Sequence, residues 1–280
     1  MKSTQHGVAI VLAMGVVALA ALTATALLVA QSTWARQVEL AAGHAQARLM
    51  MQAGLDWARA VLSDDRRAGN ADHPGEPWAL RLPPIPVDNG NLAGRIEDQQ
   101  GRFNLNNLLR NGKIDPAQLA HFRRLLSVLD LAAAHADALA AWIEADRRPL
   151  ADAADLALVR GFDEQARARL RPFVTALPRF TAVNANTASP EVLAAVVDGL
   201  GLDDARAIVE QRERAHFRNF GEFFSRLPPG FVVPTENISV SSDYFIATMR
   251  VSIGAAQARG SALLWREGAG WPVVVWRKSP

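Results

Sequence analysis

The sequence contains no cysteine and a single tyrosine. Without cysteine the chain can form neither a disulfide nor a thiolate metal site. Neither sign of charge dominates, since 30 basic side chains face 28 acidic ones, so the composition does not indicate a nucleic-acid ligand. The sequence has no His-Glu-x-x-His pair, phosphate loop or Gly-x-Ser-x-Gly elbow, and its six histidines are scattered without ligand spacing. We therefore expect a protein that is not an enzyme.

The sequence does have one long uncharged run near its start. No charged side chain occurs in residues 8–30. At about 1.5 Å of rise per residue, a helix of this length spans roughly 35 Å, which is enough to cross a hydrocarbon core of about 30 Å. Lys2 is the one fixed charge ahead of the run, so the charge bias places the amino terminus in the cytoplasm and the rest of the chain across the membrane.

Three kinds of amino-terminal segment fit this run. A secretory signal peptide has a shorter apolar region and a small-x-small cleavage site, which residues 24–26 (Ala-Thr-Ala) supply. A plain single-span anchor is the second kind. The third is a prepilin-type leader, a short polar peptide that ends at Gly7 and is cut on the cytoplasmic side before Val8, so that the whole apolar helix is retained.

Helical spacing continues beyond this run over residues 31–62. Apolar residues recur every three or four positions there and define one face, which we expect to pack on a sheet. That face consists of Val38, Ala42, Ala45, Leu49, Ala53, Trp57 and Ala60. Prolines and glycines then predict a loop over residues 63–91, and loose alternation predicts a strand over residues 92–98.

Two similar stretches each precede a helical pattern, residues 103–107 (Phe-Asn-Leu-Asn-Asn) and residues 183–187 (Val-Asn-Ala-Asn-Thr). Both place two asparagines one residue apart, and asparagine side chains cap exposed helical amides and form turns. We therefore predict two related helical units. Further helical spacing lies between the two stretches, over residues 116–131, 133–145 and 150–170.

The second unit contains a candidate helix-hairpin-helix module in residues 184–224. Its hairpin consists of Gly199, Leu200 and Gly201. In a DNA-binding hairpin, the backbone amides after the glycines hold a phosphate. Asp203 and Asp204 follow the glycines here and oppose a phosphate, so we prefer a structural hairpin and expect no nucleic-acid partner. The alternative is a membrane-anchored periplasmic DNA receptor that uses this hairpin.

The last part of the chain has the pattern of β-strands, with alternating branched and aromatic residues. The predicted strands are residues 236–242, 244–253, 261–266 and 271–277. We expect all of them to join the strand that begins at residue 92, which makes the helical block an insertion. The predicted fold is α+β, a long amino-terminal helix packed on an antiparallel sheet with an inserted all-α domain.

These patterns, together with a resemblance to type IV pilins at residues 7–12, divide the chain into five expected parts. They are a leader (1–7), a transmembrane or filament-core helix (8–30), the stalk helix, loop and first strand of a pilin-like domain (31–102), an inserted helical domain (103–230) and strands that complete the sheet (231–280).

The start of the mature segment, residues 7–12 (Gly-Val-Ala-Ile-Val-Leu), resembles the processing site of type IV pilins and pseudopilins. Those proteins usually carry glutamate as the fifth mature residue, where this chain has Leu12. A buried carboxylate without a partner is unfavourable, so its absence suits a subunit with no neighbour above it. The K-type minor pseudopilins of type II secretion systems lack this glutamate. The chain also resembles that family, in order, at residues 101–106, 142–146, 177–178 and 184–188.

The resemblance implies a structural protein at the tip of the type II secretion pseudopilus, which helps to initiate pseudopilus assembly and protein export across the outer membrane. It implies cleavage by prepilin peptidase between Gly7 and Val8, methylation of Val8, and a role for Leu12 in assembly. The implied partners are the I-, J- and H-type minor pseudopilins and the major pseudopilin. The implied location is the inner membrane, crossed once, with the carboxy-terminal domain in the periplasm.

Calcium binding is a property of the family that this chain resembles. The chain lacks the longer loop with a Gly-x-Glu-Asp element that members of that family usually have. Oxygen ligands are present in Glu144, Asp146, Asp152 and Asp155, although two arginines lie among them and the regular alternation of an EF-hand is missing. A solvated acidic face is the competing interpretation, and we expect no cofactor.

Overall fold

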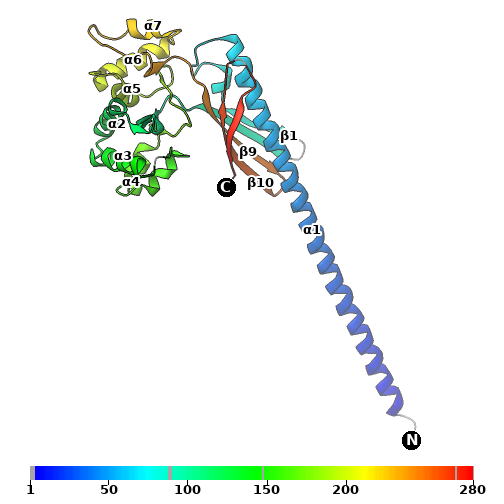
Figure 1. The fold of residues 1–280 in the computed structure, drawn as a ribbon. Helices are drawn as coiled ribbons and strands as arrows, with labels where there is room; N and C mark the ends of the chain where they lie inside the picture. Colours follow the sequence, from blue (N-terminus) through cyan, green and yellow to red (C-terminus); the bar gives the residue numbers. More distant parts are fainter. Residues whose placement is uncertain (1–3, 88–89, 147, 269, 280) are drawn as a thin grey trace.

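The computed structural model describes residues 4–87, 90–146, 148–268 and 270–279. Helix α1 (Thr4–Ala68) runs for 65 residues without a break. Figure 1 shows its amino-terminal part standing free and its carboxy-terminal part lying against a sheet. The apolar run and the stalk therefore form one continuous helix. The carboxy-terminal part of α1, the sheet and the helices beside it make up the head of the molecule.

The sheet has five antiparallel strands in the order β1-β2-β9-β10-β11. Their bounds are β1 (Leu82–Val87), β2 (Gly90–Asp98), β9 (Tyr244–Ile253), β10 (Ala256–Trp265) and β11 (Val273–Lys278). Strand β9 lies in the centre and pairs with β2 from Gly90↔Ile253 to Asp98↔Phe245. Helix α1 packs on one face of β9 and β10, which confirms the predicted α+β class.

The face of α1 that contacts the sheet is not the predicted one. The buried residues of α1 are Ala47, Leu55, Ala58 and Leu62 with Gly54 and Ser63. A Cβ atom added at Gly43 would lie 3.1 Å from the Cβ of Ala256, so the helix approaches the sheet through its small residues. The large side chains of the predicted face point outward, and Leu49 is 73% and Trp57 42% exposed. We call the exposed face the outer stripe, comprising Val38, Ala42, Ala45, Leu49, Ala53 and Trp57.

The predicted loop over residues 63–91 was wrong at both of its ends. Helix α1 continues to Ala68, and the segment also contains the 3-10 helix η1 (Pro77–Ala79) and strand β1. Three prolines lie within β1. Among the described residues, strand β1 pairs with β2 alone and is an edge strand, and an edge tolerates residues that lack a backbone N–H donor.

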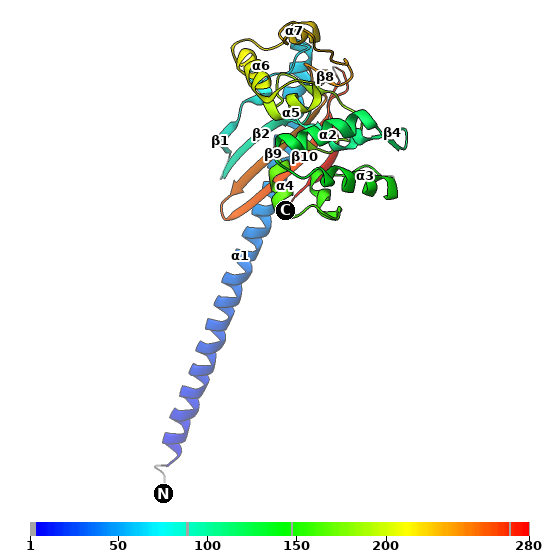
Figure 2. The ribbon, with the colours of Figure 1, turned by 90° about the vertical axis from the view of Figure 1, so that its left-hand side faces the viewer.

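The helical insertion lies between β2 and β9 in the chain. Its helices are α2 (Pro116–Val128), α3 (Ala134–Asp146), α4 (Glu164–Leu170), α5 (Pro190–Val196), α6 (Leu202–Arg214) and α7 (Phe220–Ser225), with the 3-10 helices η2 (Leu105–Leu108) and η3 (Ala153–Leu158). It has its own apolar core, in which Phe103, Phe122 and Leu193 are buried. Figures 1 and 2 show it beside the sheet, at the end of α1 remote from the amino terminus.

Two parallel strand pairs divide the insertion into two units. Strand β3 (Phe103–Asn104) pairs with β6 (Val174–Thr175), and β7 (Val183–Asn184) pairs with β8 (Ile238–Ser239). A small hairpin, β4 (Leu109–Arg110) with β5 (Lys113–Ile114), lies within the first unit. Strand β8 therefore belongs to the second unit, and the expectation that residues 236–242 join the main sheet was wrong.

The paired asparagines perform the same function in both units. The first asparagine of each pair accepts a hydrogen bond from the backbone N of the second, at 3.1 Å in one unit and 2.9 Å in the other. Asn106 then donates to the carbonyl of Leu150 and accepts from its amide, at 2.9 and 2.8 Å. Asn186 makes the same two bonds with Phe217, both at 2.8 Å. The structure thus contains the two related units that the asparagine pattern predicts.

Candidate functional site

The amino-terminal segment presents an uncovered apolar surface. Gly7 and Val8 lie in the helical backbone of α1, and Leu12 is 64% exposed. Residues 9–42 are exposed throughout. Within the described residues, α1 is the one helix long and apolar enough to cross a membrane, with a mean hydropathy of 2.4 in its most apolar window. Such a surface needs lipid or other apolar helices around it.

The hairpin residues connect α5 to α6. Gly199 has φ of +80°, in the left-handed region that favours glycine, while Leu200 is buried in the core of the insertion. Gly201 is the N-cap residue of α6. Asp203 pairs with Arg206 at 2.8 Å, and Asp204 also lies in the first turn of α6. Carboxylates therefore occupy the helix start where a phosphate would have to bind, and this geometry disfavours DNA.

Two of the four candidate calcium ligands are engaged in local structure. Asp152 caps η3 and forms an ion pair with Lys278, while Asp155 accepts hydrogen bonds from two backbone amides at 2.9 and 3.0 Å. Burial opposes ionisation of Asp152, but its hydrogen bonds hold its pKa below the usual value. Glu144 is exposed on α3, and the side chain of Asp146 lies outside the described residues.

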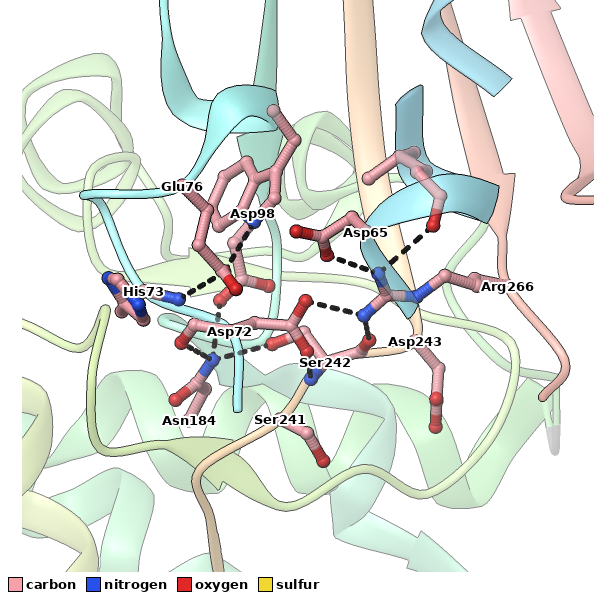
Figure 3. Close-up of polar contacts among 12 residues, drawn as sticks. Asp65, Asp72, His73, Glu76, Asp98, Asn184, Ser241, Ser242, Asp243 and Arg266 are labelled. Atoms are coloured by element: carbon pink, nitrogen blue, oxygen red, sulfur yellow. Dashed lines mark hydrogen bonds and ion pairs between the residues drawn. The ribbon is translucent and has the colours of Figure 1, made fainter. Parts of the chain in front are cut away.

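A buried polar cluster lies where the insertion joins the sheet (Figure 3). We call it the junction cluster, comprising Asp65, Asp72, His73, Glu76, Asp98, Asn184, Ser242 and Arg266. These side chains come from the end of α1, the segment that follows it, the end of β2, strand β7 and the residues that flank β9 and β10. The cluster therefore joins segments that belong to both parts of the head.

Arg266 is the cation at its centre, and its side chain is fully buried. One guanidinium nitrogen contacts Asp65 at 2.8 Å and the carbonyl oxygen of Leu62 at 3.3 Å. The other contacts Asp72 at 2.5 Å and the carbonyl oxygen of Ser242 at 2.7 Å. A buried charge is tolerated only when it is paired and hydrogen-bonded in this way. Arg266 thus holds the end of α1 against the segment that follows it and against the residues that lead from the insertion into β9.

Asn184 extends the cluster into the insertion. Its amide nitrogen donates to the carbonyl of Asp72 at 3.1 Å, to Ser242 Oγ at 2.9 Å and to a carboxylate oxygen of Asp98 at 3.3 Å. Thr187 also donates to this oxygen of Asp98. Asp72 completes the connection, because its carboxylate accepts the backbone N–H of Ser242 at 2.7 Å. The first asparagine of the second unit therefore connects the insertion to the sheet.

The cluster contains more carboxylates than cations. Burial, reinforced by the nearby Glu76, raises the pKa of Asp65 to about 6, and burial raises the pKa of Asp98 to about 6. Oxygen atoms of Asp65, Asp72 and Glu76 lie within 4.8 Å of one another, the spacing of a metal site. Arg266 already contacts two of these three carboxylates and supplies the positive charge, so the geometry is that of an ion-pair network.

The sequence pattern did not predict this cluster. Arg266 contacts partners 201 and 194 residues away in the chain, and no spacing rule connects such positions. Asp65 and Asp72 fell within the predicted loop, where a charged residue ordinarily faces solvent. The one available signal was an arginine at the end of an otherwise apolar strand segment, residues 261–266.

The continuous helix, whose free part is apolar and whose end packs on an antiparallel sheet, defines the class of pilin-like subunits. Family models described as "Type II secretion system (T2SS), protein K" match residues 101–179 and 183–241, which coincide with the two units of the insertion. Type II secretion system protein K of Pseudomonas aeruginosa is 32% identical over 91% of this chain and 86% of that protein. The protein of the same name from Klebsiella pneumoniae is 27% identical over 98% and 96%. The chain therefore belongs to the type II secretion system protein K family and is a minor pseudopilin.

A solved structure has the same fold. A chain in the crystal structure of the GspK-GspI-GspJ complex from the enterotoxigenic Escherichia coli Type 2 Secretion System superposes with a TM-score of 0.75. The match covers 87% of this chain and 99% of that one, at 23% sequence identity. These findings confirm the family resemblance and the predicted fold, and they replace the alternative of a DNA receptor.

Proposed function

We propose that this minor pseudopilin occupies the tip of the type II secretion pseudopilus, binds the I- and J-type minor pseudopilins there, and helps to initiate pseudopilus assembly. The observation that carries the proposal is the outer stripe, an apolar face of α1 that runs from the free part of the helix along the head. Leu49 and Trp57 lie on it with large exposed fractions, and exposed apolar surface of this kind marks a protein contact. The similar solved chain lies in a complex named for three such subunits.

The free part of α1 suits a single-pass inner-membrane anchor, and we place the head in the periplasm. Prepilin peptidase then cleaves between Gly7 and Val8 and the new amino terminus at Val8 is methylated. The intact mass of protein from membranes is expected to lack Met1 to Gly7. A mature chain that begins near Leu27 would instead indicate an ordinary signal peptide.

The tip position rests on two features. Leu12 provides no carboxylate to pair with the terminal amine of a neighbouring subunit. Its presence therefore suits a subunit that has no neighbour above it. The insertion lies beside the sheet at the end of α1 remote from the membrane segment (Figure 1). A bulky unit at this end is compatible with the last subunit of a filament, which also contacts the H-type and major pseudopilins below it.

Co-purification from membranes tests the interaction. An affinity tag on the full chain is expected to recover the I- and J-type minor pseudopilins, and Leu49→Glu is expected to reduce the recovery about tenfold, because it places a charge on the outer stripe. Lys113→Glu, an exposed change in the insertion, is the matched control and is expected to leave recovery unchanged. Equal recovery with all three chains would contradict a contact through the outer stripe.

We further propose that the role is structural, with no catalysis and no cofactor. The engagement of Asp152 with Lys278 and of Asp155 with backbone amides supports this, because both carboxylates are already satisfied without an ion. Calorimetric titration of the metal-free head with Ca²⁺ is expected to give no saturable heat. A stoichiometric, saturable signal would overturn the proposal.

A further inference from the structure

A cleft of about 580 Å³ lies between the insertion and the face of the sheet opposite α1. Residues from η3, α4 and β6 form one wall, and the strands β9, β10 and β11 form the other. The volume falls in the range of ordinary ligand sites, roughly 300 to 1,000 Å³. The packing of the insertion therefore leaves part of the second sheet face uncovered.

The floor of this cleft is apolar. Ile246, Leu263 and Trp276 reach it from three adjacent strands, and Val174 and Leu177 reach it from the insertion. Side chains alternate along a strand. The residues next to Ile246 and Leu263 in their strands therefore pack against α1, whereas Ile246 and Leu263 face the cleft. An apolar floor favours ligands that bring apolar side chains to it.

Three arginines line the same cleft, Arg102, Arg167 and Arg171. Arg167 lies in the short helix α4 (Glu164–Leu170), and Arg171, four residues further on, is the C-cap residue of that helix. Among the described residues none of the three forms an ion pair. Arg102 donates to a neutral amide oxygen at 3.3 Å, and Arg167 donates to a backbone carbonyl at 3.2 Å.

The carboxylates of the cleft do not balance these cations. Asp152 is one of two in the lining; it forms an ion pair with Lys278 and is also attracted by Arg171. Glu164 is the other, exposed at the start of α4. Guanidinium groups bind carboxylates through charge-assisted, often bidentate hydrogen bonds, so the lining favours an anionic ligand with carboxylate groups.

We propose that this cleft binds a short acidic peptide segment of a partner protein, with apolar side chains on Ile246 and Trp276 and carboxylates on Arg167 and Arg171. The combination of an apolar floor with unpaired guanidinium groups selects such a segment over a purely apolar one and over a small inorganic anion. The proposal does not depend on the position of the chain in the pseudopilus, because the cleft lies within one head.

The test uses the full chain in an uncharged detergent and two fluorescein-labelled peptides. One is N-acetyl-Leu-Glu-Leu-Asp-Leu-Lys(fluorescein)-amide, and the other has Gln and Asn in place of Glu and Asp. Fluorescence anisotropy is expected to show saturable binding of the acidic peptide, at least about tenfold tighter than the amide peptide. The affinity is expected to fall as NaCl rises from about 50 to 300 mM, because the ion pairs are at the surface.

The double variant Arg167→Gln/Arg171→Gln is expected to bind the acidic peptide about tenfold or more weakly. Its affinity for the amide peptide is expected to stay unchanged. Arg169→Gln is the matched control, because Arg169 lies on the same helix but does not line the cleft. Circular dichroism melting establishes that each variant is folded. Equal affinity for the two peptides, absence of saturable binding at millimolar peptide, or an equal loss in the control would overturn the proposal.

Discussion

The guanidinium of Arg266 lies 2.5 Å from the carboxylate of Asp72, although 194 residues separate them in the chain. Both side chains are buried. Arg266 comes directly after β10, the second strand beyond the insertion, and Asp72 lies between α1 and η1, so this pair connects the end of β10 to the segment that follows α1. The contact therefore joins two segments that the insertion separates in the chain.

Replacing Arg266 by methionine is expected to lower the free energy of unfolding by about 3–5 kcal/mol, because it leaves Asp65 and Asp72 as uncompensated buried carboxylates. Urea unfolding of the head, residues 36–280, measures the change. The described buried residues of α1 begin at Ala47, so this head is expected to fold alone.

Arg277→Met is the matched control for that experiment. Arg277 is exposed and donates to Gln52, so its loss is expected to change the free energy of unfolding by less than about 0.5 kcal/mol. If both variants lose the same stability, the buried ion pair does not hold the head together.

The second prediction concerns pH. Burial raises the pKa of Asp98 to about 6 in the folded state, above its value of about 3.9 in an unfolded chain. The folded state therefore takes up a proton between pH 6 and 4 that the unfolded state does not bind. This contribution to stability is fully present below about pH 4 and is lost as pH rises through about 6.

Asp98→Asn removes that contribution, so its stability relative to the wild type is expected to fall by about 1–2 kcal/mol between pH 7.5 and 4.5. The comparison is made between variants because burial lowers the pKa values of His73 and His216, which act in the opposite direction. Asp64→Asn, at an exposed ion pair with Arg67, is the control and is expected to parallel the wild type. Parallel curves for Asp98→Asn would show that this carboxyl is already ionised at pH 5.

The third prediction tests which face of α1 packs on the sheet. Gly43→Leu places a side chain where even a Cβ lies 3.1 Å from Ala256, so overpacking is expected to lower the free energy of unfolding by about 1–3 kcal/mol. Ala53→Leu introduces leucine on the outer stripe instead. This variant is expected to change the free energy of unfolding by less than about 0.5 kcal/mol. The reverse order would mean that the outer stripe packs on the sheet.

The sequence predicted the elements of the fold better than their contacts. Hydropathy identified α1, alternation identified β2 and β9, and the paired asparagines identified two units, because each of these signals is local. The packing face of α1 was mispredicted because hydrophobicity favoured Leu49 and Trp57, whereas the close approach of helix to sheet selected Gly43 and Ala47. Such selection depends on the distance between elements, which periodicity does not contain.

The junction cluster and the cleft were not predictable from the sequence for a related reason. Arg266 and Asp72 become partners only after the insertion is folded, and the arginines of the cleft come from two segments of the insertion. Family resemblance supplied the function, since the site has no reactive group whose spacing would reveal it. The processing residues Gly7 and Val8 stay predictions that mass analysis decides.

The fourth prediction concerns Leu12. Leu12→Glu is expected to leave cleavage at Gly7 and the head intact, since leucine and glutamate have similar helix propensities. In a low-dielectric helix bundle, an unpaired carboxylate costs several kcal/mol, whereas one beside a terminal amine is compensated. The variant is therefore expected to initiate pseudopilus assembly poorly or to be incorporated into the shaft of the pseudopilus. Secretion and the number and length of pseudopili measure the effect, with Leu12→Ile as the control. If secretion and the number and length of pseudopili are unchanged, Leu12 does not support a position at the tip.

The position of the chain in assembled pseudopili tests the central claim most directly. An epitope inserted in the exposed turn at Asn111 and Gly112, between β4 and β5, marks the subunit for gold labelling and electron microscopy. Pseudopili from a strain that carries only the tagged chain are expected to be labelled at one end and nowhere along the shaft. Label distributed along the shaft, or normal pseudopili in a strain that lacks the chain, would contradict a tip subunit that initiates assembly.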